Sequence, residues 1–480
     1  MSPENNSDKS PMGVLFLVVL IDMIGLTLVI PFLTYFVQDL ALADGITGIG
    51  ARDIWVGIII AAYSAAQFIF TPILGALSDR WGRRPILMLG LASNTIFFTV
   101  FGLSGSLTMA LIARFLAGAG NGNIAVAKAY IGDISSTEET AARMGAIGAA
   151  FGLGFMIGPF IGGVLSDPAS TFGGMFDTTF WRNYPYLLPC LFCSLLSLTS
   201  LSIATRHLPE SLALENRTGP AKSAISGFTK MMTNSVKVLR IPTISTLVII
   251  NFLYMVGFSM MHGTFILFTA LSADSGGLGF SEFQNGLVFA FIGLLGVIVQ
   301  GMLIGKLTKK FSMSILMVVG IIASGLGIAS LPYVPSGTAW LIYLSAGLMA
   351  IGNGLYSPTQ SSVLTFASKS SDEDLGMVMG AQEGLGALAR IIGPLSAAYI
   401  WSLTVEGGGM WTYHTCFRVA GVFFIAAALL LFPDSGVDVG GFPIYISDLI
   451  GLAILVGTWL ILGKGLPAAP EPKLENAPSS

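Results

Sequence analysis

Apolar runs of about twenty residues or more recur from one end of the sequence to the other, and no other feature restricts the possible folds as strongly. A helix needs about 20 predominantly apolar residues to cross the ~30 Å hydrocarbon core of a bilayer. Twelve runs reach that length, near residues 13–37, 54–78, 85–105, 108–132, 143–166, 183–205, 241–271, 282–305, 313–332, 338–366, 376–402 and 413–432. The sequence therefore predicts an all-α polytopic membrane protein.

The composition agrees with this prediction, because 54% of the residues are hydrophobic and only 10% are charged. A soluble domain carries about 25% charged residues. We therefore exclude a soluble enzyme and a nucleic-acid binder. Cys190 and Cys193 form a C-x-x-C pattern, but it lies inside an apolar run without a second pair or a nearby histidine. We interpret both as packing residues and expect no metal site and no cofactor.

The distribution of positive charge predicts the orientation of the chain. The loops on one side carry fifteen Lys and Arg residues, whereas those on the other side carry only Arg52, Arg182 and Arg418. Because Lys and Arg concentrate in cytoplasmic loops, we expect a cytoplasmic N-terminus. The first run is longer than the roughly 7–15-residue core of a cleaved signal peptide, so we expect it to remain as a membrane helix.

Short motifs recur in the same order in the two halves of the sequence. Gly120-Asn121-Gly122 returns as Gly352-Asn353-Gly354, and Gly158-Pro159 returns as Gly393-Pro394. Parallel repeats of this kind are a known transporter construction. We expect a cytoplasmic N-terminus (1–12), a six-helix bundle (13–205), a cytoplasmic linker (206–240), a second six-helix bundle (241–432), an extra hydrophobic segment with a possible thirteenth helix (433–465) and a disordered tail (466–480).

The loop after the second run, at 75–84, reads GALSDRWGRR. Its Asp79 follows a helix C-terminus, the unfavourable end of the helix dipole for a carboxylate. A neighbouring arginine or a helix N-terminus from the other half must therefore hold it, and such a contact would latch the cytoplasmic face. The alternative is that the arginines only anchor this loop on the cytoplasmic side, as Lys and Arg do in membrane proteins generally. The candidate gating residues are Gly75, Asp79, Arg80, Gly82, Arg83, Arg84 and, as an acidic partner, Asp133.

Charged residues inside the runs are the candidates for coupling. Asp22 lies ~14 Å deep in the first run and Arg114 lies ~10 Å below the outer end of the fourth. A carboxyl group at that depth is usually functional and could exchange a proton near neutral pH. We expect Arg114 to approach Asp22 in one state and to leave it in another. The alternatives are a permanently paired Asp22 and an Arg114 that only satisfies backbone carbonyls. Lys128, Glu383 and Arg390 are further candidates, although snorkelling explains Lys128 equally well.

These segments carry a resemblance to a known family. The loop at 75–84 resembles the signature cytoplasmic loop of the major facilitator superfamily, and 111–122 (LIARFLAGAGNG) resembles its span-four motif, with Arg114 in the arginine position. Residues 148–163 (GAAFGLGFMIGPFIGG) look like the span-five motif of drug:proton antiporters, while 208–217 and 285–301 are similar to the tetracycline-efflux branch. The resemblance implies two six-helix bundles with pseudo-two-fold symmetry, alternating access and proton-driven export, with Asp22 matching an aspartate linked to proton coupling. The second-half copy of the loop, at 305–311, lacks the aspartate, so any latch is one-sided.

Glycines in the fifth run recur every four residues and form a small-residue face, which allows another helix to approach closely. The resemblance implies a tight contact between the two halves that seals the antiporter; ordinary packing is the alternative. We also expect Pro159 to bend the helix. The candidate residues are Gly154, Gly158, Pro159, Gly162 and Gly163.

Polar residues in the middle of the runs should face the interior, because polar groups facing lipid are costly. Each either lines a substrate cavity or bonds a neighbouring helix. The resemblance places spans one, four, seven and ten around the cavity. The candidates are Asn121, Asn123, Tyr254, His262 and Asn353.

The sequence thus favours a monomeric, proton-coupled exporter of amphipathic or lipophilic small molecules in the plasma (inner) membrane. Its partners would be the small-molecule substrate, protons and the bilayer. One alternative is a proton symporter that imports a metabolite. Another is a non-transporting receptor or scaffold, which would have no use for Asp22 and Arg114.

Overall fold

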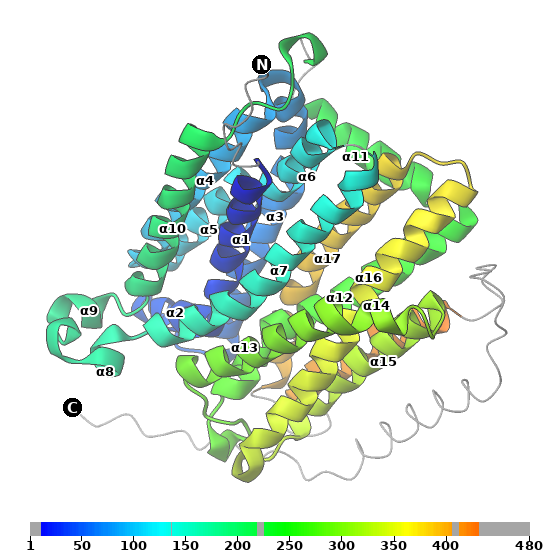
Figure 1. The fold of residues 1–480 in the computed structure, drawn as a ribbon. Coiled ribbons are helices and arrows are strands. Elements are labelled where there is room, and N and C mark those ends of the chain that lie inside the picture. Colours follow the sequence, from blue (N-terminus) through cyan, green and yellow to red (C-terminus); the bar gives the residue numbers. More distant parts are fainter. Residues whose placement is uncertain (1–10, 136, 218–224, 406–411, 432–480) are drawn as a thin grey trace, which may run out of the picture. The chain divides into compact units, whose positions relative to one another are not determined.

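The computed structural model describes residues 11–135, 137–217, 225–405 and 412–431. Within these ranges the chain is almost entirely helical, and each of the twelve predicted spans contains helix (Figure 1). Ten helices are long and apolar enough to cross a membrane, and shorter apolar helices cover Ile30–Ala43, Gly152–Leu165 and His414–Leu429. The extra segment 433–465 and the tail 466–480 lie outside the described residues, as does most of the segment 1–12.

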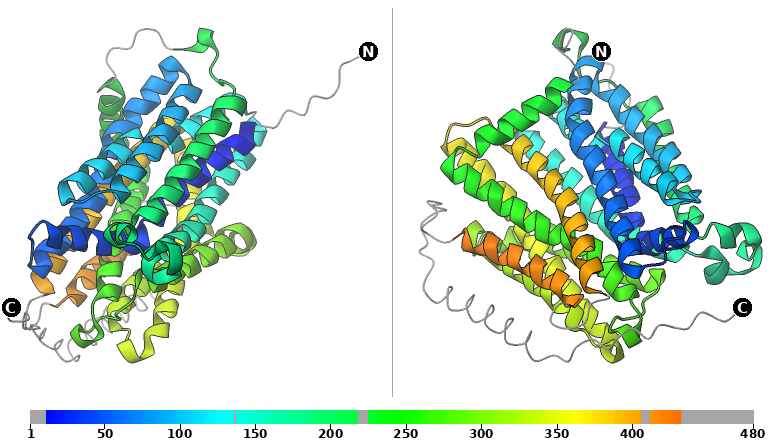
Figure 2. Two further views of the ribbon diagram at one scale, coloured as in Figure 1. Left: turned by 90° about the vertical axis from the view of Figure 1, so that its left-hand side faces the viewer. Right: turned by 180° about the vertical axis from the view of Figure 1, so that it is seen from behind.

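The first half of the chain contains the helices α1 to α10. Their bounds are α1 Pro11–Leu28, α2 Ile30–Ala43, α3 Ile49–Trp81, α4 Arg83–Gly102, α5 Leu107–Gly120, α6 Asn123–Ile134, α7 Thr137–Leu165, α8 Pro168–Phe172, α9 Thr179–Asn183 and α10 Leu187–His207. The short helices α8 and α9 lie beside the ends of α7 and α10, in the connection between them (Figure 2).

The second half contains the remaining helices. They are α11 Ile225–Val238, α12 Pro242–Ala270, α13 Glu282–Ile298, α14 Ile304–Leu307, α15 Met313–Ser330, α16 Ile342–Ser370, α17 Leu375–Thr404 and α18 His414–Leu429. A π-helical turn at Val299–Leu303 joins α13 to α14. Helix α11 lies in the predicted linker (206–240).

Two predicted spans are interrupted rather than continuous. The span at 13–37 is split into α1 and α2 at Val29, where Pro31 occupies the first turn of α2 and cannot donate a backbone bond. The span at 108–132 is split into α5 and α6 at Asn121 and Gly122. Apolar length predicts that a segment crosses the membrane, but it does not locate such breaks.

The described residues form two compact units. Unit 1 comprises those of Met1–Thr47, Ile58–Asn234 and Ser281–Gly301, and unit 2 those of Gly48–Gly57, Ser235–Phe280 and Met302–Ser480. Each unit therefore includes a short piece from the other half of the sequence. The predicted limits of the two six-helix bundles stay a prediction.

Helix α1 is central in unit 1, where it packs against α7, α10 and α6. Buried apolar side chains from α1, α4 and α6 form its core, including Leu15, Val19, Leu87 and Tyr130. Membrane helices associate through close packing and buried hydrogen bonds rather than through exclusion of water. The core of unit 1 therefore holds the polar residues of α1 and α4 in fixed positions.

Candidate functional site

Asp22 lies inside unit 1, near the middle of α1, and is 1% exposed. The Nδ2 atom of Asn94 on α4 donates a hydrogen bond of 2.8 Å to its Oδ1. Asn123 at the start of α6 lies beside the carboxyl group without a hydrogen bond of normal geometry, and Asp22 Oδ2 has no partner among the described residues. The carboxyl group is thus held from one side only.

Arg114 on α5 is also buried, with 4% exposure. Its guanidinium lies 4.6 Å from the ring centre of Tyr63 and 5.5 Å from that of Phe101. Its Nε and Nη1 make no hydrogen bond, and within the described part of the chain no ion pair joins it to Asp22. The structure therefore shows the two charges apart, with the arginine stacked on aromatic rings.

Tyr63 on α3 connects these groups, although it was absent from the predicted site. Its hydroxyl accepts a 2.6 Å hydrogen bond from Asn121 Nδ2. The ring lies within electrostatic reach of both Asp22 and Arg114. A tyrosine in the middle of an otherwise apolar run was the available sequence signal.

Glycines let the broken span α5–α6 approach α3 and α4. A Cβ on Gly118 would overlap the carbonyl oxygen of Tyr63, and one on Gly122 would lie 2.8 Å from Leu74 Cδ1. A Cβ on Gly90 of α4 would overlap the side-chain amide of Asn123. The absence of side chains at these positions brings Asn121 and Asn123 to the buried cluster.

The loop at 75–84 is organised around the guanidinium of Arg83. It pairs with Asp79 Oδ1 at 2.5 Å and with Asp133 Oδ2 at 3.0 Å, and it donates to Ser78 Oγ at 2.7 Å. Gly82, between α3 and α4, has a φ of 104°, a conformation that favours glycine. The predicted arginine partner of Asp79 and the predicted pairing of Asp133 are both present; their role in gating stays a prediction.

The other residues of that loop contribute less to this network. Arg84 donates a 2.6 Å hydrogen bond to the carbonyl oxygen of Thr205. Arg80 is exposed and has no ion pair among the described residues. A Cβ on Gly75 would meet nothing within 4 Å, so close packing does not require glycine there.

Glu210, in the segment after α10, is a residue that the sequence analysis did not select. Its Oε1 accepts from the backbone N–H of Arg83 at 2.8 Å, and its Oε2 accepts from that of Arg84 at 3.3 Å. A carboxylate at a helix N-terminus is stabilised by the unpaired N–H groups there. Glu210 therefore fixes the first turn of α4, which carries Arg83.

The small-residue face of α7 contacts a different helix from the one expected. Cβ atoms on Gly154, Gly158 and Gly162 would overlap α1, at Met23, Thr27 and Leu28. These glycines therefore pack within the first half, and the expectation that they join the two halves was wrong. Spacing by four defines a face, but it does not say which helix covers it.

The opposite side of α7 does contact the second half of the chain. A Cβ on Gly163 would lie 2.8 Å from the carbonyl oxygen of Glu282 and 3.0 Å from Gly286 Cα on α13, and one on Gly293 would overlap Met156. A Cβ on Gly286 would lie 2.9 Å from the carbonyl oxygen of Pro159. Helix α7 runs without interruption through Pro159.

Polar residues of unit 2 form a second buried network around Tyr254 on α12. Its hydroxyl lies 2.9 Å from Ser324 Oγ and donates to Asn353 Oδ1 at 3.2 Å. Its ring stacks on Tyr356 with centroids 3.7 Å apart. Here Tyr254 and Asn353 bond neighbouring helices. His262 lies with its ring edge against Phe258, at 5.3 Å between centroids.

The three less certain charges lie on two helices. Lys128 is half-buried on α6, Glu383 is exposed on α17 and Arg390 is half-buried on the same helix. Arg390 lies within electrostatic reach of His262.

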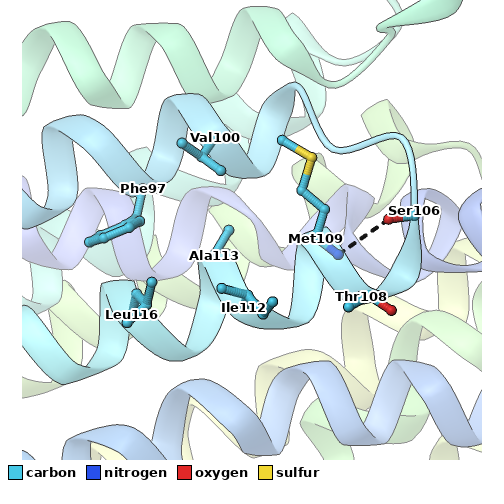
Figure 3. A pocket seen from close by; sticks show the side chains of 8 residues that line it. All are labelled: Phe97, Val100, Ser106, Thr108, Met109, Ile112, Ala113 and Leu116. Carbon is cyan, nitrogen blue, oxygen red and sulfur yellow. Dashed lines mark hydrogen bonds between the residues drawn. The ribbon is translucent and has the colours of Figure 1, made fainter.

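A cavity of about 300 Å³ lies between α4 and α5, apart from the predicted polar residues (Figure 3). Met109, Ile112 and Leu116 at its edge are exposed apolar residues. It is lined by Phe97, Val100, Ser106, Thr108, Met109, Ile112, Ala113 and Leu116. Without a charged side chain it offers no site for coupling.

Buried charges inside a bundle of apolar helices, on a chain whose two halves share short motifs, are typical of a multi-pass membrane transporter. Comparison with known proteins places it further. Residues 15–394 match the Major Facilitator Superfamily, so the chain belongs to that superfamily.

Individual relatives cover nearly the whole chain. It is 26% identical over 433 residues to the tetracycline resistance protein, class B, of Escherichia coli, covering 90% of this chain and 98% of the relative. It is 28% identical over 473 residues to major facilitator superfamily domain-containing protein 10 of Mus musculus, covering 89% and 94%.

Solved structures share the fold. The human organic anion transporter MFSD10 (TETRAN) superimposes with a TM-score of 0.63 at 24% identity, covering 89% of this chain and 100% of that chain. A D-xylose-proton symporter superimposes with a TM-score of 0.68 at 14% identity, covering 88% and 98%.

Proposed function

We propose that this transporter exports amphipathic or lipophilic small molecules in exchange for protons, by alternating access. The observation that carries the proposal is Asp22. It is buried in the middle of a membrane helix, one of its oxygens is bonded to Asn94 and the other has no partner among the described residues. An ionisable group in that position marks a functional site, and proton relay is one of the roles that such carboxyl groups have.

The protonation state of Asp22 determines which partners its carboxyl group requires. The neutral carboxyl group tolerates burial with the single bond from Asn94, whereas the ionised group needs a cation. Arg114 supplies one, because it is stacked on Tyr63 and Phe101 and has no acidic partner in the described chain. Its long side chain can move between the rings and the carboxylate. Protonation from outside and release inside would then alternate with substrate export.

The Arg83 network is the proposed cytoplasmic latch. It joins the end of α3, the start of α4 and the end of α6 through Asp79 and Asp133. All of these contacts lie within unit 1, and the proposal is that they break and re-form as the cytoplasmic side opens and closes. The first turn of α4, held by Glu210, keeps the arginine in place during this exchange.

The relatives support export as the direction. Several are named as tetracycline resistance proteins, and the direct way for a membrane transporter to give resistance is to move the compound out of the cell. Tetracycline is therefore one probe to test on this chain. We place the protein in the plasma membrane with a cytoplasmic N-terminus, on the distribution of Lys and Arg.

Proton release from inside-out vesicles tests the proposal. The lumen, which is the outer side, is acidified and its pH is followed with a fluorescent dye while tetracycline, tetraphenylphosphonium or chloramphenicol is added. We expect at least one compound to trigger proton efflux in the wild type. The efflux should be lost in Asp22→Asn and kept in Asp177→Asn, which changes an exposed loop aspartate.

The other outcomes are equally informative. Efflux that survives Asp22→Asn would assign coupling to another residue and refute the proposed role of Asp22. A compound loaded into the lumen that leaves it together with protons would establish import by symport and refute export.

A further inference from the structure

Two hydrogen-bond donors of unit 2 converge on the space beside Gly386 on α17. Arg390 Nη1 lies 3.8 Å and Asn251 Nδ2 lies 4.0 Å from the position that a Cβ on Gly386 would take. Arg390 belongs to the same helix and Asn251 to α12. Neither nitrogen has a hydrogen-bond acceptor among the residues that the structure describes, so the space between them is rich in donors.

The direction of the Asn251 amide is set by its neighbours. Tyr356 donates a 3.4 Å hydrogen bond to Asn251 Oδ1, which occupies the amide oxygen and leaves the NH₂ group on the Arg390 side. Tyr356 is itself stacked on Tyr254, which is bonded to Ser324. Asn251 is 5% exposed. The NH₂ group of Asn251 and the guanidinium of Arg390 are therefore both available to an acceptor that does not belong to the described residues.

Arg390 stands at the depth where an unpaired cation costs most. It is the sixteenth residue of the 30-residue helix α17, or ~22 Å from either end at 1.5 Å per residue. No carboxylate pairs with it in the described part of the chain. His262 lies within its electrostatic reach and adds no negative charge. The described part of the site therefore lacks an anion paired with Arg390.

We propose that Arg390 and Asn251 bind the anionic group of the substrate, and that the substrate is an amphipathic organic anion with an aromatic body. The guanidinium fork and the adjacent amide match the oxygens of a carboxylate. Gly386 leaves room for that group. The rings of Phe258 and His262, which lie in edge-to-face contact, offer the aromatic body a surface beside the cation. The inference that the bound anion is transported rests on the proposed function, whereas the inference that it binds at this site does not.

Direct binding to the full-length protein in detergent tests this site without a proton gradient. The probes are 2-naphthoate, its neutral amide 2-naphthamide and the cation 2-naphthylmethylammonium, titrated by calorimetry. In the wild type we expect 2-naphthoate to bind at least about tenfold more tightly than the amide, as a charge-assisted bond predicts. The cation should not bind.

Variants locate the site. Arg390→Gln and Asn251→Leu should each remove the preference for the anion, and Gly386→Val should block 2-naphthoate by filling the space. Arg390→Lys keeps the charge and should keep part of the preference. The matched control is Arg418→Gln, which removes an arginine of the same unit that is bonded to Tyr333; it should leave the preference unchanged.

The unfolding temperature without ligand separates binding from structure. Removal of an unpaired cation should not lower it, so a folded Arg390→Gln protein without the preference supports the site. A folded Arg390→Gln protein that keeps the preference would overturn it, as would equal binding of the acid and the amide to the wild type. Absence of binding by all three probes at millimolar concentration would overturn the aromatic-anion assignment. If the wild type showed no proton coupling in the vesicle assay but still preferred 2-naphthoate to its amide, the proposed function would be overturned and the binding site would stand.

Discussion

The contact between α1 and α7 is the packing feature with the most direct quantitative consequence, and Gly158→Ala probes it. A Cβ at this position would overlap Thr27 Oγ1 and lie 2.8 Å from the carbonyl oxygen of Ile24 and 3.1 Å from the backbone nitrogen of Leu28. Two of these atoms belong to the backbone of α1. The extra methyl group therefore cannot be accommodated by a side-chain rotation alone, and the two helices must separate.

The magnitude follows from three contributions. Overpacking of a tight core costs about 1–3 kcal/mol. The displaced Thr27 hydroxyl loses its 2.9 Å bond to the carbonyl oxygen of Gly154, worth about 1 kcal/mol. Replacing glycine by alanine inside a helix returns about 0.5–1 kcal/mol. We expect a net loss of about 2 kcal/mol of unfolding free energy.

The control is Gly380→Ala on α17, where a Cβ would meet nothing within 4 Å. This variant should gain the helix contribution alone and be about 0.5–1 kcal/mol more stable than the wild type. Unfolding in mixed micelles at increasing dodecyl sulfate, followed by tryptophan fluorescence, gives both values. If Gly158→Ala proved as stable as Gly380→Ala, the close approach of α1 and α7 would be refuted.

Three further changes test the cytoplasmic network and a buried bond of unit 2. Asp79→Asn removes a half-exposed partner of Arg83 and should lower the transport rate at least about tenfold with normal membrane insertion. Arg80→Gln on the same loop should leave the rate unchanged. Equal transport rates for these two variants would contradict the latch. Glu210→Gln should cost about 1 kcal/mol by weakening the cap on α4, measured as a lower unfolding temperature against the exposed Glu215→Gln. Trp401→Phe removes the 2.8 Å hydrogen bond from Trp401 Nε1 to the buried Asp53 and should cost about 1.5–3 kcal/mol in the micelle assay, while Phe at the exposed Trp340 should cost nothing measurable.

The presence and order of the apolar spans could be predicted from the sequence, because bilayer thickness sets a minimum apolar length, and each of the twelve predicted spans contains helix. The breaks could not. Gly-Asn-Gly occurs in both halves, yet the span is interrupted at Asn121 and α16 runs without interruption through Asn353. Neighbouring helices decide whether a small, polar triplet keeps its helical hydrogen bonds, and a single sequence does not contain that information.

The candidate site was predictable in its depth but not in its contacts. The position of Asp22 within its run indicated burial, and the structure agrees. The choice of Arg114 between a carboxylate and the ring of Tyr63 depends on the direction of two long side chains, which spacing along the helix does not determine. Glu210 was missed because the donors to its carboxylate are backbone N–H groups in the first turn of α4, far away in the sequence, and no side-chain pattern indicates such a contact.

The interruption of the fourth span has a consequence for water. Helix α6 begins at Asn123 with Gly122 before it and no side-chain cap, so the first N–H groups of α6 find no acceptor within the helix. In hydrocarbon each such group is costly, and irregular backbone at membrane depth is tolerated where it is enclosed by protein or reached by water. The corresponding triplet in α16 keeps its helical bonds and makes no such demand. The two repeats therefore differ in what their centres must supply: the first needs acceptors from protein or water for these N–H groups, and the second does not.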